Sequence, residues 1–189
     1  MMLARLVSVP LLALALAGPV LAQMIEVRQF TVEPAEESYV VNANFEFILT
    51  PRLEEALNNG VVLSFMIEFE LMRPRWYWFD EKAAAERLEV KLAFNPLLRQ
   101  YRVSTGPLHR NFSSLADALN VVSRLRSWQV FERDRVRADT SYVAALRMRL
   151  DTAQLPKPFQ LSAITDRELT LASEWRRMPF TTVPERSAQ

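Results

Sequence analysis

The clearest pattern along the chain is the alternation of apolar and polar residues, which is typical of β-strands with one buried face. Segments 39–49, 61–71, 88–94 and 142–150 place large apolar residues at every second position. Antiparallel sheets commonly have one face buried against the core and one face exposed to solvent. The same pattern is shorter in five further strand candidates, at 25–32, 98–104, 108–112, 159–164 and 169–175.

Two segments instead carry the signals of short helices. Thr50 followed by Pro51 is a typical N-cap with proline in the first turn, and Gly60 is a typical residue just past a helix end. Ser114 and Asp117 have capping-box spacing and precede an apolar stripe with helical periodicity. We therefore predict helices at about 51–59 and 114–126, in an α+β fold of mostly antiparallel strands that forms a two-layer β-sandwich.

Prolines mark turns and connections within the chain, and the composition indicates where the folded domain ends. Asn95-Pro96 is a turn signal, and Pro156 and Pro158 predict extended backbone that crosses between the sheets. No repeat or change in composition marks a second domain. We predict a single β-rich domain at 23–178 and a flexible tail at 179–189, which is polar and contains proline.

The first 22 residues resemble a secretory signal peptide. Arg5 supplies the positive charge, an apolar run covers 6–17, and Val20-Leu21-Ala22 resembles a cleavage site. The apolar run is shorter than the roughly 20 residues of a membrane-spanning helix. We therefore expect export to the periplasm with cleavage, an uncleaved N-terminal anchor being the alternative, and no transmembrane segment in the mature chain.

The composition excludes several classes of protein. Without Arg5, the remaining chain holds 22 basic and 22 acidic residues, whereas a nucleic-acid-binding domain is normally basic. The absence of cysteine excludes disulfides and Cys-containing zinc sites, and the only histidine, His109, has no metal-ligand spacing around it. With Gly60 and Gly106 as the only glycines after the leader, no phosphate-binding loop or nucleophile elbow is present. We predict no cofactor, no metal and no catalytic residue.

Four consecutive aromatic residues between arginine and aspartate form the densest candidate site. Trp, Tyr and Arg dominate the binding energy of many protein interfaces. The same residues could instead close the end of a strand over the core. The interpretation that gives them a function is a partner-binding patch made of Arg73, Arg75, Trp76, Tyr77, Trp78 and Asp80.

Charged residues elsewhere fit simpler roles. Glu68 and Glu70 share one strand face, as do Arg147 and Arg149, which predicts cross-strand ion pairs on a solvated face. The basic run of Arg124, Arg126, Arg133, Arg135 and Arg137 is interrupted by acidic residues and predicts a solvated loop or edge.

Five short segments together resemble a proteobacterial family of small exported proteins. They are 57–61 (LNNGV), 73–78 (RPRWYW), 149–151 (RLD), 155–159 (LPKPF) and 173–175 (SEW). That family is catalogued only as a domain of unknown function, and some members are labelled "proline-rich signal peptide protein". The resemblance implies a Gram-negative envelope protein whose gene often lies beside that of an NtrY-type membrane sensor kinase. It supplies no catalytic or binding residues.

These observations favour a non-enzymatic periplasmic binding or accessory protein. Its partner would be another envelope protein, with a membrane sensor kinase as the candidate that the resemblance implies. One alternative is an enzyme that acts on envelope glycans or peptides through carboxylates such as Asp80 and Glu81, and another is a carrier of a small apolar ligand between the sheets. The oligomeric state stays open.

Overall fold

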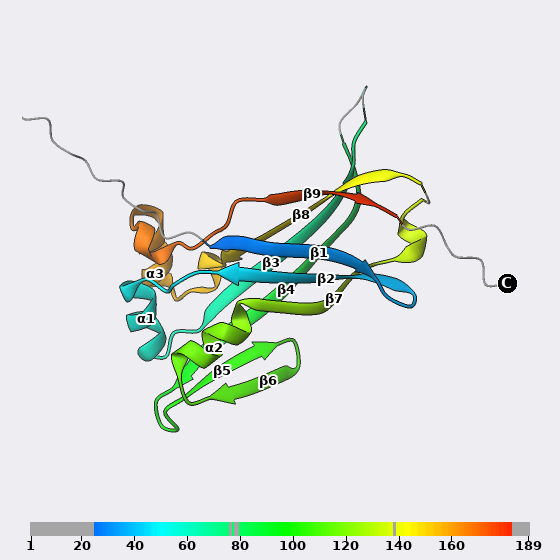
Figure 1. The fold of residues 1–189 in the computed structure, drawn as a ribbon. Coiled ribbons are helices and arrows are strands. Elements are labelled where there is room, and N and C mark those ends of the chain that lie inside the picture. Colours follow the sequence, from blue (N-terminus) through cyan, green and yellow to red (C-terminus); the bar gives the residue numbers. More distant parts are fainter. Residues whose placement is uncertain (1–24, 76, 78–79, 138, 183–189) are drawn as a thin grey trace, which may run out of the picture.

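Two antiparallel sheets face each other, and three short helices gather toward one end of them (Figure 1). The computed structural model describes residues 25–75, 77, 80–137 and 139–182. The predicted α+β class with mostly antiparallel strands is confirmed. The signal-peptide prediction for residues 1–22 lies outside the described residues.

The strands are divided unequally between the sheets. The smaller sheet has the order β1-β2-β7 and the larger sheet the order β6-β5-β4-β3-β8-β9. The strands are β1 (Glu26–Pro34), β2 (Ser38–Glu46), β3 (Leu63–Arg73), β4 (Glu81–Asn95), β5 (Gln100–Thr105), β6 (Leu108–Phe112), β7 (Arg124–Glu132), β8 (Ser141–Leu150) and β9 (Arg176–Thr181). The helices are α1 (Pro51–Asn58), α2 (Leu115–Val122) and α3 (Lys157–Thr165), and η1 (Arg133–Arg135), η2 (Thr152–Gln154) and η3 (Arg167–Leu169) are single 3₁₀ turns.

The core lies between the two sheets, where the apolar faces predicted from the alternation meet. Phe69 of β3 is fully buried, and its ring lies 6.5 Å from that of Phe30 on β1 and 5.9 Å from that of Phe131 on β7. Tyr39 of β2 stacks on Phe131 at 4.9 Å. Aromatic contacts of this kind add to the free energy of area burial and fix how the two layers align.

Both ends of α1 form as the sequence predicts. The Thr50 hydroxyl accepts a hydrogen bond from the Leu53 N–H at 3.1 Å. At the other end Gly60 has φ +86°, and the N–H groups of Gly60 and Val61 donate to the carbonyls of Leu57 and Ala56. This is a Schellman motif, and it needs a residue that tolerates positive φ at position 60.

We expect Thr50→Ala to lower the free energy of unfolding by about 1–2 kcal/mol. Thr50 is 1% exposed, and besides capping α1 its hydroxyl donates to the Glu168 carbonyl of η3 at 2.5 Å. The substitution therefore leaves the buried Leu53 N–H and the part-buried Glu168 carbonyl without this partner. Urea denaturation checks the value. Ser114→Ala, which removes the N-cap of the less buried α2, is the matched control and should cost less stability. Equal losses of unfolding free energy in the two variants would contradict a stabilising role for the hydrogen bond between Thr50 and η3.

The predicted end of the second helix is wrong. The helix α2 ends at Val122, and residues 124–126 belong to β7 instead. The Phe45 N–H donates to the Ser123 carbonyl at 2.8 Å, and Leu125 pairs with Ala43 of β2. Pairing with β2 thus overrides the helical periodicity. The alternation in β7 is hidden because its pairing with β2 has two irregularities, one of them beside Ser127, which has φ +49°.

Two of the shorter strand candidates are also wrong, so the fold has a third helix. Segment 159–164 lies in α3, where Pro156 is the N-cap residue and Pro158 stands in the first turn. Prolines are accepted there because the first N–H groups of a helix have no intrahelical partner, so this pair does not keep the chain extended. Segment 169–175 forms no strand: Leu169 is the last residue of η3, and Ala172 makes a single bridge with Arg149, although Leu169 and Leu171 are buried.

The predicted boundary of the C-terminal tail is wrong as well. Residues 179–181 belong to β9, which pairs with β8 and brings Phe180 against Tyr142. Phe180 and Thr182 are buried, so the ordered sheet continues past the predicted limit at 178. Within the part of the chain that the structure describes, no helix has the length and apolar character needed to cross a bilayer.

Candidate functional site

The hairpin of β3 and β4 extends beyond the rest of the larger sheet as an arm, which we define as residues 72–82 (Figure 1). Pairing between β3 and β8 ends at Met72, whereas pairing between β3 and β4 continues to Arg73 and Glu81. A register shift at Leu71 and Met72 marks the base of the arm. Such a bulge bends a hairpin and increases its twist. The described members of the predicted patch, Arg73, Arg75, Tyr77 and Asp80, therefore lie in the outer part of this arm.

A shared carboxylate organises the charges of the arm. Arg73 and Arg75 both donate to Glu81 Oε2, and the Arg75 N–H points to Asp80 Oδ1 at 3.4 Å. The hydrogen bond from Arg75, with the positive charge of both arginines, holds the pKa of Glu81 below its ordinary value against the opposing effect of burial. Glu81 is thus kept ionised and paired, which suits a structural ion pair and does not suit a general acid.

The described members of the predicted patch are not in the core. Tyr77 is 65% exposed, Asp80 is exposed, and Arg73 and Arg75 are half-buried by their pairing with Glu81. Trp76 and Trp78 lie outside the described residues. The structure brings Arg73, Arg75, Tyr77 and Asp80 together on one hairpin tip.

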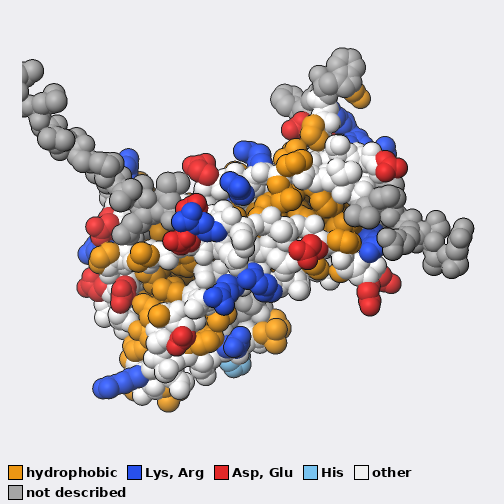
Figure 2. Space-filling view, viewed as in Figure 1, with side chains coloured by type: hydrophobic (Ala, Val, Ile, Leu, Met, Phe, Trp, Pro, Cys, Tyr) orange, Lys and Arg blue, Asp and Glu red, His pale blue; other side chains and the backbone are white. Residues whose placement is uncertain are grey.

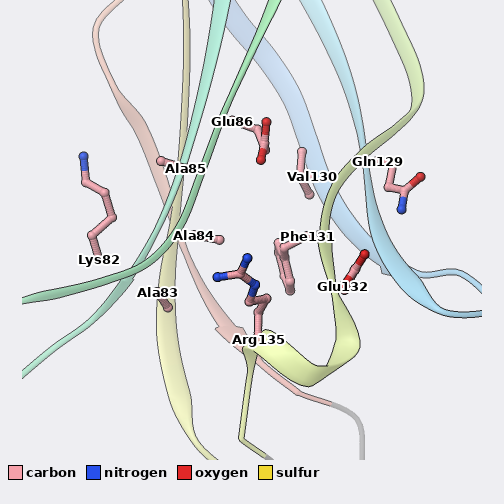
Figure 3. A pocket seen from close by; sticks show the side chains of 10 residues that line it. All are labelled: Lys82, Ala83, Ala84, Ala85, Glu86, Gln129, Val130, Phe131, Glu132 and Arg135. Atoms are coloured by element: carbon pink, nitrogen blue, oxygen red, sulfur yellow. The ribbon is translucent and has the colours of Figure 1, made fainter.

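A groove of about 590 Å³ runs between the base of the arm and β7 (Figure 3). One wall is the start of β4, where Ala83 and Ala84 leave space beside the buried Leu71. The other wall is the end of β7 with η1. The lining consists of Lys82, Ala83, Ala84, Ala85, Glu86, Gln129, Val130, Phe131, Glu132 and Arg135.

Side chains of both charges face this groove. Glu86 from β4 and Arg135 from η1 point into the same space, with Glu132 at its far side and Phe131 behind them (Figure 3). Among the described residues, none forms an ion pair with Glu86, Glu132 or Arg135. The groove therefore holds both acidic and basic side chains next to the arm.

Residues 22–179 match the model of a protein family described as a domain of unknown function, DUF4390. This chain belongs to the DUF4390 family. The match confirms the resemblance to a family catalogued only as a domain of unknown function. Neither a curated protein nor a solved structure shows a significant match to the chain.

On the opposite face of the larger sheet, the DUF4390 domain has a buried carboxylate among arginines. Glu68 is 5% exposed and accepts from Arg147 Nε at 2.5 Å and from Arg149 Nε at 3.3 Å, with Arg87 Nε at 3.5 Å. Burial alone would raise the pKa of Glu68, but the hydrogen bonds and charges of Arg147 and Arg149 hold it below its ordinary value. The predicted cross-strand pairing is confirmed, although at Glu68 it is buried and not solvated.

The other candidates of the sequence analysis have ordinary positions in the DUF4390 domain. His109 is exposed on β6. No group of acidic or histidine side chains suited to holding a metal occurs within the described residues. Arg124 and Arg126 of the basic run lie in β7, an edge strand, and Arg133 and Arg135 lie in η1, while Arg137 follows η1. Arg133 donates to the Ala35 carbonyl at 2.6 Å.

The groove beside the arm was not found from the sequence. Its walls come from β4 and β7, which lie in different sheets, and the lining residues of the two walls are more than 40 residues apart in the chain. The available signal is the run Ala83-Ala84-Ala85, whose small side chains interrupt the large apolar residues of the strand. Which strand faces these alanines depends on how the sheets stack.

Proposed function

We propose that this DUF4390 protein is a non-enzymatic binding protein of the Gram-negative periplasm that contacts another envelope protein through its arm. The observation that carries the proposal is the projecting tip, where Arg73, Arg75, Tyr77 and Asp80 lie together away from the core. The residue types are those that dominate interface energies. The signal-peptide pattern of residues 1–22 supports the location, and the family resemblance suggests a membrane sensor kinase as the partner.

The ion pairs of the arm support a role in binding. Because Glu81 holds both Arg73 and Arg75, these two side chains are positioned before a partner arrives, which reduces the conformational entropy that they lose on binding. The adjoining groove at Glu86 and Arg135 could receive a polar segment of the same partner. The alternative of carboxylate catalysis needs a general acid, and Glu81, paired and ionised, does not offer one.

Photo-crosslinking in cells tests this proposal. A photoreactive amino acid at position 77 should crosslink to one envelope protein, whereas the same group at Leu97 should not. Leu97 is 94% exposed in the β4–β5 turn, so it is a matched control on another hairpin tip. A product identified by mass spectrometry as the same protein at both positions, or no product at position 77, would overturn the assignment of the arm.

Alanine substitution of Trp76 and Trp78 should then abolish partner capture. We expect recovery of the crosslinked partner from envelope extracts to fall about tenfold or more, as for loss of interface hot spots. The midpoint of thermal unfolding should stay unchanged, because the described neighbours of these tryptophans, Tyr77 and Asp80, are exposed. Leu97→Ala with Leu98→Ala is the control pair. A folded Trp variant that recovers its partner in full would show that these tryptophans are not the contact.

A further inference from the structure

A second groove, of about 800 Å³, lies where the larger sheet extends past the smaller one, beneath α2. Its floor is the inner face of three adjacent strands, with Ile67 of β3, Leu88 and Val90 of β4, and Val103 of β5. Val121 of α2 and Trp128 of β7 form the opposite side. This volume is within the range of about 300–1,000 Å³ that is typical of small-molecule sites.

Three arginines line the rim of this apolar groove: Arg110 of β6 and Arg124 and Arg126 at the start of β7. Figure 2 shows Lys and Arg side chains gathered over the start of β7 next to hydrophobic side chains. Within 25–75, 77, 80–137 and 139–182, no carboxylate forms an ion pair with any of the three. In contrast, Arg147 and Arg149 on the other face share Glu68.

The rim charge is held in place by the fold. Arg126 donates to the carbonyls of Ala43 and Leu125 at 2.9 and 2.7 Å and to Asn44 Oδ1 at 2.7 Å, all of which are uncharged acceptors. Its positive charge is therefore positioned without being neutralised. Asp117, which also lines the groove, accepts from the Ser114 hydroxyl at 2.6 Å in the α2 cap. The rim retains an excess of positive charge over an apolar floor.

We propose that this groove binds a single-chain amphiphile with an anionic head group, the chain lying on the floor and the head at the three arginines. The floor crosses from β3 to β5, two interstrand spacings or about 10 Å, which suits a chain better than a compact ring. Arginine is well suited to carboxylate and phosphate because it offers several N–H donors in a planar fork. The proposal is independent of the arm and its partner.

Titration calorimetry with the purified protein tests the chemistry of the ligand. Dodecanoate and dodecyl phosphate, both below their micelle-forming concentrations, should bind, and the tighter of the two identifies the preferred head group. Dodecyltrimethylammonium, with the same chain and the opposite charge, should bind about tenfold more weakly or not at all. Equal affinity for the anionic and cationic probes, or no binding of either anion, would overturn the proposal.

Charge reversal tests the location of the head group. Arg110→Glu with Arg124→Glu should weaken dodecanoate binding about tenfold or more, while Arg110→Lys with Arg124→Lys should largely retain it. Both arginines are exposed, so the variants should fold. Arg99→Glu with Arg177→Glu makes the same change in net charge at exposed positions outside the groove. Equal weakening by the two reversed pairs would show a general charge effect and contradict the site.

Val121→Asp tests the chain-binding part of the groove separately. Val121 is half-buried on α2 and lines the groove, so a carboxylate there should repel the anionic probe and remove apolar surface. Dodecanoate binding should be lost, while crosslinking from a photoreactive residue at position 77 stays unchanged. Undiminished dodecanoate binding by the folded variant would place the chain elsewhere.

Discussion

Replacing Phe69 by alanine is expected to lower the free energy of unfolding by about 3–5 kcal/mol. Phe69 has no exposed surface and contacts rings from both strands that face it, Phe30 on β1 and Phe131 on β7. Truncation removes buried apolar area and leaves a cavity at the junction of the two sheets. Because the chain has no cysteine, no disulfide could offset the loss. Urea denaturation followed by tryptophan fluorescence measures the change.

Two variants make this measurement specific. Phe69→Leu keeps much of the buried volume and should cost less than the alanine variant. Leu97→Ala removes an apolar side chain of which 94% is exposed, so it should leave the unfolding transition in place. A Phe69→Ala protein as stable as the Leu97→Ala protein would contradict the packing of the two sheets on this residue.

Glu68→Gln is expected to cost about 2–3 kcal/mol at neutral pH. The substitution keeps the size of the side chain but removes the charge that pairs with Arg147 and Arg149, and its amide N–H₂ would face their guanidinium groups. Loss of one member of a buried ion pair is costly because the remaining charges are left uncompensated. Glu70→Gln, which breaks the more exposed pair with Lys82, is the matched control and should cost well under about 1 kcal/mol.

The effect of Glu68→Gln should depend on pH in a defined direction. The folded protein holds the pKa of Glu68 below that of the unfolded chain, which is about 4.3. The ionised carboxylate therefore contributes its stability above about pH 4.3, and this contribution is lost as the pH falls through the folded pKa. The difference in unfolding free energy between wild type and variant should be constant from about pH 7 to 5 and shrink toward about pH 3. A difference that grew on acidification would contradict the arrangement.

The alternating segments predicted the main strands because each pairs with few interruptions. In β3, Phe65, Ile67 and Phe69 lie on the core side along a regular ladder, so apolar residues recur at every second position. The strand β7 was not predicted from alternation, because its bulges shift Trp128 and Phe131 away from a strict two-residue spacing. Segment 159–164 shows the opposite error, because its apolar residues suggested a strand but the segment is helical. Leu161 and Ile164 are exposed on this helix, which begins at the prolines.

The candidate site was predictable only as a group of neighbours in sequence. Residues 73–80 are close in sequence and so had to lie near one another. The structure adds that Arg73 and Arg75 pair with Glu81 across the β3–β4 hairpin. The groove at Glu86 and Arg135 and the rim of Arg110 and Arg124 combine residues from strands far apart in the chain. No local pattern specifies such combinations.

The sequence by itself determined the features that depend on short-range chemistry, which are the regular strands, the starts of α1 and α2, and the end of α1 at Gly60. It also determined the family resemblance and the absence of cysteine. Hydrophobic period, capping side chains and glycine at positive φ act over a few residues, so the order of residues is sufficient to predict them. Only the tertiary structure decided where α2 stops, which strand is bulged, and that the larger sheet extends past the smaller one. These depend on backbone pairing and side-chain packing between distant segments, such as Phe45 with Ser123 and Phe69 with Phe131. Both grooves and the projecting arm lie where strands of the larger sheet extend past the strands beside or opposite them.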